Sequence, residues 1–172
     1  MGQIIIKQGD ITKEDTEAIV NAANTTLRGG GGVDGAIHRA AGPLVLDECI
    51  KIGGCATGDA VITNAGKLTC QKIIHTVGPV YNGGRRGEAD LLRHCYEKSF
   101  ELATQNGVKS IAFPAISTGA YRYPIEEATR IALEEGIKFQ GLFEEIRYVC
   151  FSASDLDVYT RIFQELKGCH QP

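Results

Sequence analysis

Four consecutive glycines, Gly29 to Gly32, form the most unusual stretch of this sequence. They follow a short apolar run and precede a segment with helical periodicity, so they join a predicted strand to a predicted helix. Glycine lets the backbone approach a ligand closely, and the helix behind the loop adds unpaired amides and a partial positive charge. The pattern predicts a phosphate-binding loop rather than a flexible surface connector.

A second loop with similar chemistry also lies between a predicted strand and a predicted helix, and its sequence is Ser117-Thr118-Gly119-Ala120-Tyr121. Hydroxyl groups, a glycine and a helix N-terminus suit phosphate oxygens. Ser117 does not lie in a GxSxG sequence, so we do not expect a nucleophilic serine. Two such loops together indicate a diphosphate ligand.

Three glycines of the first loop and helix, Gly30, Gly32 and Gly35, also match the GxGxxG fingerprint of dinucleotide-binding proteins. That fingerprint requires a second strand that ends in an acidic residue about 20 positions later. Residues 49–54 instead have the pattern of a helix end. The sequence therefore disfavours a nicotinamide enzyme.

Four polar residues lie close to these loops: Asp10, Asn24, Asp34 and His38. Asp10 follows the first predicted strand, where a turn or capping role is favoured. Asn24 and Asp34 bracket the glycines, and Asp34 could either cap the helix or hold a water beside a bound phosphate. His38 lies one turn after Asp34 on the same helix face, and we expect it to be buried and hydrogen-bonded.

Short apolar runs alternate with longer amphipathic ones, and these predict the elements that carry the loops. Strands are expected at residues 4–7, 18–22, 59–64, 73–77, 110–113 and 146–151. Helices are expected at residues 33–41, 44–52, 92–103, from 124 onward, and 155–166. This alternation predicts an α/β fold with a largely parallel sheet covered on both faces, with ligands beyond the carboxyl ends of the strands.

The composition is that of an ordinary folded protein. The 172 residues are 43% hydrophobic and 23% charged, with a net charge of −3, and we expect one domain over residues 1–172. Lysine and arginine form no basic stripe, so nucleic acid is disfavoured as a partner. The apolar stretch at the start is too short for a signal peptide, and no segment approaches membrane-spanning length. We expect a cytoplasmic monomer without a membrane partner.

Six cysteines are present, and none forms a CxxC pair, which disfavours a zinc site of the usual spacing. Cys95 falls in a predicted helix and Cys150 in a predicted strand, so both are expected to be buried free thiols. The cysteine content does not suggest a secreted disulfide scaffold.

Five segments, taken in order, resemble the signature of the MacroD-type members of the macrodomain family. They are Gly9 to Thr12, Val20 to Asn24, Gly29 to His38, Ile74 to Pro79, and Ala115 to Tyr121. With the last predicted strand and helix, the resemblance covers nearly the whole chain. It implies a three-layer α/β/α sandwich with a mixed, largely parallel sheet, and it implies that the ligand is ADP-ribose.

The resemblance also implies the binding residues. Asp10 would accept a hydrogen bond from the adenine amino group beside the backbone of Ile11. Phe151 would pack on adenine, and an ordinary core position is its alternative. One phosphate would meet Gly31, Gly32 and Val33. The other phosphate and the distal ribose would meet Ser117, Thr118, Gly119, Ala120 and Tyr121.

The catalytic residues implied by the resemblance are Asn24, which would contact the distal ribose, and Asp34. Either Asp34 or a substrate phosphate would accept the proton of an attacking water. MacroD-type members are hydrolases that remove ester-linked ADP-ribose from mono-ADP-ribosylated proteins and deacetylate O-acetyl-ADP-ribose. The resemblance implies no metal and no other cofactor, because the added Cys/His set of the zinc-dependent variety is missing between Asn24 and Arg39.

Two other function classes remain alternatives. A non-catalytic reader module would bind ADP-ribose and recruit modified partners, although the Asn24 and Asp34 pair argues for an enzyme. RNA binding is disfavoured by the acidic balance and the isoelectric point of about 5.8, because phosphate contacts normally dominate such affinity.

Overall fold

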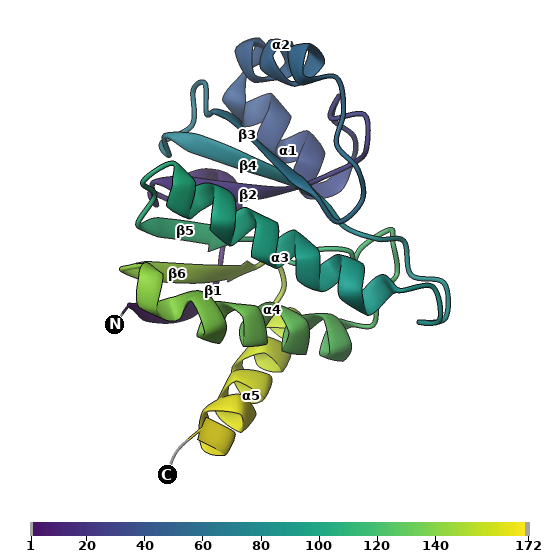
Figure 1. The fold of residues 1–172 in the computed structure, drawn as a ribbon. Coiled ribbons are helices and arrows are strands. Elements are labelled where there is room, and N and C mark those ends of the chain that lie inside the picture. The colour runs from purple at the N-terminus through teal and green to yellow at the C-terminus, as the bar shows by residue number, and fades with distance from the viewer. Residues whose placement is uncertain (1, 171–172) are drawn as a thin grey trace.

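The centre of the protein is a six-stranded sheet with the strand order β1-β6-β5-β2-β4-β3 (Figure 1). The computed structural model describes residues 2–170 and the side chains up to residue 168. Neighbouring strands run parallel except β3 and β4, which pair antiparallel, so the prediction of a mixed, largely parallel sheet is confirmed. The strands are β1 (Gln3–Gln8), β2 (Ala18–Ala23), β3 (Ala60–Asn64), β4 (Lys72–Val77), β5 (Ser110–Phe113) and β6 (Glu145–Cys150).

Each predicted helix occurs, with its ends shifted by a few residues. The α-helices are α1 (Gly32–Ala41), α2 (Pro43–Ile52), α3 (Glu88–Gln105), α4 (Ile125–Phe139) and α5 (Ala153–His170). Two short 3-10 helices, η1 (Ile11–Lys13) and η2 (Gln140–Leu142), complete the connections. Within residues 2–170, no helix is both long and apolar enough to cross a membrane.

Successive strand residues face opposite helical layers, as the two-residue period of a strand requires. Val20 and Ile74 pack in the core formed with α3, α4 and α5. Their neighbours Ile19 and Ile73 pack in the core formed with α1 and α2. Figure 1 shows α3 and α4 crossing the same face of the sheet. The predicted three-layer α/β/α sandwich is therefore confirmed.

The two cysteines that were expected to be structural are free and buried, Cys95 in α3 and Cys150 in β6. Burial raises the pKa of Cys95 to about 11 and that of Cys150 to about 12. Both thiols therefore stay protonated at neutral pH and act as small apolar side chains. The side chain of Cys169 lies outside the described residues.

The last strand is shorter than predicted, because β6 ends at Cys150 and Phe151 lies beyond it. Ser152 accepts a hydrogen bond on Oγ from the backbone amide of Asp155 at 3.1 Å, which turns the chain into α5 directly after the strand. Phe151 is 90% exposed as a result. The alternative that Phe151 is an ordinary core residue is wrong.

β2 and β5 separate soon after they pair. The register joins only the first two residues of β2, Ala18 and Ile19, to β5 within the described part of the chain. β5 ends at Phe113, and Pro114 follows it without an amide hydrogen to donate to a neighbouring strand. β2 continues to Ala23, paired on its other side with β4. The sheet is therefore open between β2 and β5 at its carboxyl edge.

Helix α4 packs closely on the sheet at Gly136. The Tyr148 hydroxyl of β6 donates a hydrogen bond to the Ala132 carbonyl at 2.6 Å, and a Cβ at Gly136 would overlap that hydroxyl. We predict that Gly136→Ala lowers the free energy of unfolding by roughly 1 kcal/mol or more, although alanine is the better helix former. Denaturant unfolding measures this change.

The matched control is Gly168→Ala in α5, where an added Cβ meets no atom within 4 Å. This variant should be as stable as the parent protein or slightly more stable. Equal stability of the two alanine variants would contradict the close contact at Gly136.

Candidate functional site

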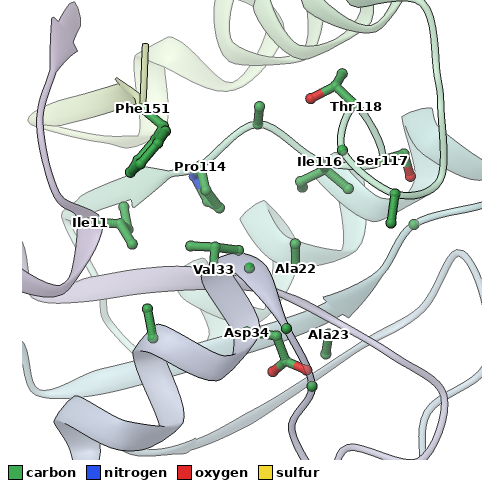
Figure 2. Close-up of a pocket in the computed structure, with 18 of the residues that line it drawn as sticks. Ile11, Ala22, Ala23, Val33, Asp34, Pro114, Ile116, Ser117, Thr118 and Phe151 are labelled. Atoms are coloured by element: carbon green, nitrogen blue, oxygen red, sulfur yellow. The ribbon is translucent and has the colours of Figure 1, made fainter.

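A cavity of about 840 Å³ opens at the carboxyl edge of the sheet (Figure 2). Its volume falls in the range typical of small-ligand sites. The segments that follow β1, β2, β5 and β6, together with the start of α1, form its wall. All of the residues predicted for the site line it, namely Asp10, Ile11, Asn24, Gly31, Gly32, Val33, Asp34, Ser117, Thr118, Gly119, Ala120, Tyr121 and Phe151.

The two ends of the cavity differ in chemistry. Figure 2 shows Ile11 and Phe151 near one end and Asp34 and Ser117 toward the other. The first end offers apolar and aromatic surface, whereas the second combines a carboxylate with a hydroxyl group. A ligand with a flat aromatic group at one end and a polar reacting group at the other would fit this arrangement.

Asp34 is a buried carboxylate, 5% exposed, in the first turn of α1. Asn21 on β2 donates a hydrogen bond from Nδ2 to Asp34 Oδ1 at 2.8 Å. The N-cap position of α1 is Gly31, and no side chain caps this helix. Of the two roles that the sequence left open, the helix cap is therefore wrong, and the carboxylate is instead held in place from the sheet.

His75 on β4 continues this network. The same Asn21 Nδ2 lies 3.1 Å from His75 Nδ1, and Thr63 Oγ1 lies 2.9 Å from His75 Nε2. Burial lowers the pKa of His75 to about 3, so its ring is neutral at neutral pH. Because the Asn21 amide nitrogen can only donate, His75 Nδ1 accepts, and the ring hydrogen lies on Nε2 facing Thr63. The neutral ring fixes the direction in which the Asn21 amide points.

His38 lies on the other side of Asp34, with its Nε2 3.4 Å from Asp34 Oδ1 and its side chain 12% exposed. The histidine was predicted to be buried, and its side chain is mostly but not completely buried. Among the described side chains, His38 Nε2 has no hydrogen-bond partner, so the expected hydrogen bond is not found at this atom. Its contact with Asp34 Oδ1 is an ion pair only when the ring carries a second proton.

His38, Cys49 and His75 offer ligand atoms within 4.8 Å of one another. However, His75 Nε2 carries the ring hydrogen and faces the Thr63 hydroxyl at 2.9 Å, so this nitrogen offers no free lone pair. A zinc ion would need a thiolate and a ring nitrogen with a free lone pair. This grouping therefore gives no support for a metal site.

Asn24 shapes the glycine loop. Its Nδ2 donates to the carbonyl oxygen of Gly29 at 2.9 Å, and its Oδ1 accepts from Thr26 Oγ1 at 2.7 Å and from the amide of Leu27 at 3.2 Å. Asn24 also lines the cavity. The contact of Asn24 with a ribose stays a prediction.

The glycine loop needs glycine for two different reasons. A Cβ at Gly35 would overlap the carbonyl oxygen of Gly30, so the loop and α1 can approach each other only without a side chain there. Gly32 has a φ of +55°, and a Cβ at Gly31 or Gly32 would meet no protein atom within 4 Å. The space above these two glycines belongs to the cavity.

The second loop is held in a conformation that is rare for its residues. Ser117 has a φ of 67° and Arg122 a φ of 63°, in the left-handed region. The amide of Tyr123 donates to the Ser117 carbonyl at 2.8 Å, which closes the loop. Ser117 Oγ is buried and has no hydrogen-bond partner among the described residues. Strain together with an unpaired buried hydroxyl is typical of a ligand site.

Asp10 caps a short helix, as the sequence favoured, and it also lines the cavity. Its Oδ1 accepts hydrogen bonds from the amide of Thr12 at 2.9 Å and from Thr12 Oγ1 at 2.7 Å, which caps η1. These bonds lower the pKa of the Asp10 carboxyl. Because Asp10 lines the cavity and directly precedes Ile11 in the chain, a fixed and ionised acceptor lies next to Ile11.

Two residues of the network had no predicted role, namely Asn21 and His75. Both side chains are completely buried and follow apolar residues in their strands. A polar residue inside such a run needs a partner, and this signal could have singled them out. Arg39 and Asp155 also line the cavity without having been predicted.

The fold and the site define an α/β protein of the nucleotide-binding class, with two phosphate-type loops beside an opening in the sheet. The family model described as the Macro domain matches residues 20–132. This chain belongs to the macrodomain family.

Known relatives and structures agree with this assignment. A macro domain-containing protein of Chlorobaculum tepidum is 52% identical, over 90% of this chain and 91% of the relative. An O-acetyl-ADP-ribose deacetylase of Pantoea vagans is 50% identical, over 94% of this chain and 99% of the relative. A variant of the Oceanobacillus iheyensis macrodomain, solved with ADPR, has a TM-score of 0.89 and 43% identity, over 95% of this chain and 92% of that one.

The lowered pKa of His75 predicts how stability depends on pH. The unfolded chain binds a proton at this residue near pH 6.5, whereas the folded protein does so only near pH 3. Folding stability from this group is therefore complete above pH 6.5 and falls by about 1.4 kcal/mol per pH unit below it. Between pH 6.5 and 5, the parent protein should lose about 2 kcal/mol more than His75→Gln.

Denaturant unfolding at the two pH values measures this difference. Most carboxylates stay ionised in this window, so their contribution largely cancels between the two proteins. If the free energy of unfolding falls equally in the parent protein and in His75→Gln, His75 is not held neutral.

Proposed function

We propose that this protein binds ADP-ribose in the cavity and hydrolyses esters of its distal ribose. The substrates are O-acetyl-ADP-ribose and proteins that carry a single ADP-ribose on an acidic side chain. The name of the Pantoea vagans relative and the ADPR in the Oceanobacillus iheyensis structure support this proposal. The two substrates share ADP-ribose and an ester bond, so one site can serve both.

The shape of the cavity suggests how ADP-ribose would lie. Adenine would pack on Phe151 and donate from its amino group to Asp10, at the end where Figure 2 shows Ile11. The diphosphate would lie between the backbone amides of the glycine loop and the second loop, since helix N-termini suit anions. The distal ribose would then lie beside Asn24 and Asp34.

The observation that carries the proposal is the buried carboxylate of Asp34. A carboxylate beside a diphosphate opposes the binding of that anion, so a pure reader module would gain nothing from it. Asn21 nevertheless holds it against the cavity at 2.8 Å. A fixed acceptor next to the reacting ester is what hydrolysis by a water molecule requires.

In the proposed reaction, water adds to the ester and the bond between the acyl group and the distal ribose breaks. The products are free ADP-ribose and a carboxylic acid. Asp34 orients the water, and its carboxylate or a substrate phosphate oxygen accepts the proton. Positioning of the water and the ester contributes more than proton transfer, because an ordinary carboxylate is a weak base. Tyr121 at the cavity wall would limit the entry of bulk water.

Asp34→Asn tests the catalytic role directly, because the amide has nearly the same shape and lacks the charge. Turnover should fall roughly a hundredfold or more, while the affinity for ADP-ribose should stay the same or increase. Release of ADP-ribose from an ester-linked, mono-ADP-ribosylated protein and of acetate from O-acetyl-ADP-ribose measures turnover, and calorimetry measures binding.

Asp47→Asn on the exposed side of α2 is the matched control and should change neither quantity. Full activity of Asp34→Asn would reject the mechanism. Binding without turnover in the parent protein would leave a reader module.

Phe151→Ala tests the predicted position of adenine. Because Phe151 is 90% exposed, its removal should leave the free energy of unfolding almost unchanged. Loss of stacking on adenine should weaken ADP-ribose binding by about 1–3 kcal/mol.

Leu142→Ala is the control, since Leu142 is 53% exposed and does not line the cavity. Calorimetry with ADP-ribose measures both variants. Unchanged affinity of Phe151→Ala would place adenine elsewhere.

A further inference from the structure

The loop between β4 and α3, residues 78–87, is unusually well fixed for an exposed glycine-rich segment. Glu88 at the start of α3 is buried, and its carboxylate accepts hydrogen bonds from three backbone amides of the loop. These come from Asn82 at 2.8 Å, Gly84 at 3.0 Å and Arg86 at 2.6 Å. One buried carboxylate therefore ties three positions of the loop together.

The same loop is joined to the wall of the cavity. Gly78 lines the cavity at the end of β4. The amide of Tyr81 donates to the carbonyl of Tyr121 at 2.9 Å, and the rings of Tyr81 and Tyr123 lie 4.9 Å apart. Figure 1 shows this loop extending from the same side of the sheet as the loop between β5 and α4. It therefore forms a rim beside the cavity segment that contains Tyr121.

This rim is positively charged, although the chain as a whole has a net charge of −3. Arg85 and Arg86 are exposed, and so is Arg122 on the adjoining loop. None of the three forms a salt bridge within the described side chains. Residues 78–87 contain no acidic side chain, and the exposed Val80 adds apolar surface.

We propose that this rim, formed by Arg85, Arg86 and Arg122, binds an acidic segment of the ADP-ribosylated protein next to the modified residue. The inference rests on the proposed function. If ADP-ribose fills the cavity with its distal ribose beside Asp34, the protein part of the substrate must leave the cavity at that end. It then passes Tyr121 and meets the rim, where two exposed arginines on a fixed loop match a chain of carboxylates.

The test compares substrates that share ADP-ribose and differ in the acyl group of the ester. The first is a peptide with one ester-linked ADP-ribose on a glutamate flanked by aspartates and glutamates. The second is the same peptide with neutral flanks, and the third is O-acetyl-ADP-ribose, which has no peptide. The variant is Arg85→Glu with Arg86→Glu. The control is Lys51→Glu with Lys67→Glu, an equal change in charge at exposed positions outside the cavity lining.

At low ionic strength, Arg85→Glu with Arg86→Glu should raise KM for the acidic peptide by about tenfold. Its KM for O-acetyl-ADP-ribose should change less than twofold, kcat should be unaffected, and added salt should reduce the difference. The lysine control should resemble the parent protein with all three substrates.

An unchanged KM for the acidic peptide would overturn the inference while leaving the proposed hydrolase intact. An equal rise in KM for all three substrates would also overturn the inference, because the loop would then affect the cavity itself. If the parent protein hydrolyses O-acetyl-ADP-ribose but neither peptide, the proposed action on proteins fails, and the inference fails with it.

Discussion

The early separation of β2 from β5 is the constraint on which the rest of this structure depends. Two parallel strands that stayed paired to their ends would fill the carboxyl edge of the sheet with backbone hydrogen bonds. Here β5 stops after four residues, and Pro114 cannot extend the pairing. The carboxyl half of β2 therefore lines a cavity on one side while β4 supports it on the other. Both phosphate-type loops leave the sheet at the edges of this opening.

The opening also explains how a buried carboxylate is held in place there. An isolated buried carboxylate is costly, but Asp34 receives a hydrogen bond from Asn21, which lies on the strand that lines the opening. Asn21 is in turn directed by His75, whose neutral ring accepts its other amide hydrogen. The sheet thus fixes the orientation of a helix residue. This rigidity is useful where a water molecule must be placed with small error.

The ligand-binding surface relies on backbone more than on cations. Among the residues that line the cavity, Arg39 is the basic side chain, and the phosphate contacts are expected from amides of the two loops. The other arginines near the site, Arg85, Arg86 and Arg122, lie on its rim, where the Glu88 carboxylate binds the loop through backbone amides, including that of Arg86. Under the proposed function, this arrangement separates the recognition of ADP-ribose in the cavity from the recognition of the group attached to it at the rim.

The sequence by itself determined the strands and helices, the two loops and the layered α/β class, because periodicity reports directly which side of an element is buried. It also indicated Asn24 and Asp34, which bracket the glycine loop, whereas the adenine contact of Asp10 was implied only by the family resemblance. Only the tertiary structure decided that Asn21 and His75 meet Asp34, that Phe151 stands in solvent at one end of the cavity, and that Glu88 fixes a distant rim. Each of these depends on which strands become neighbours and where their pairing ends. A local sequence pattern carries no information about strand neighbours, because the same alternation of residues fits any position in the sheet.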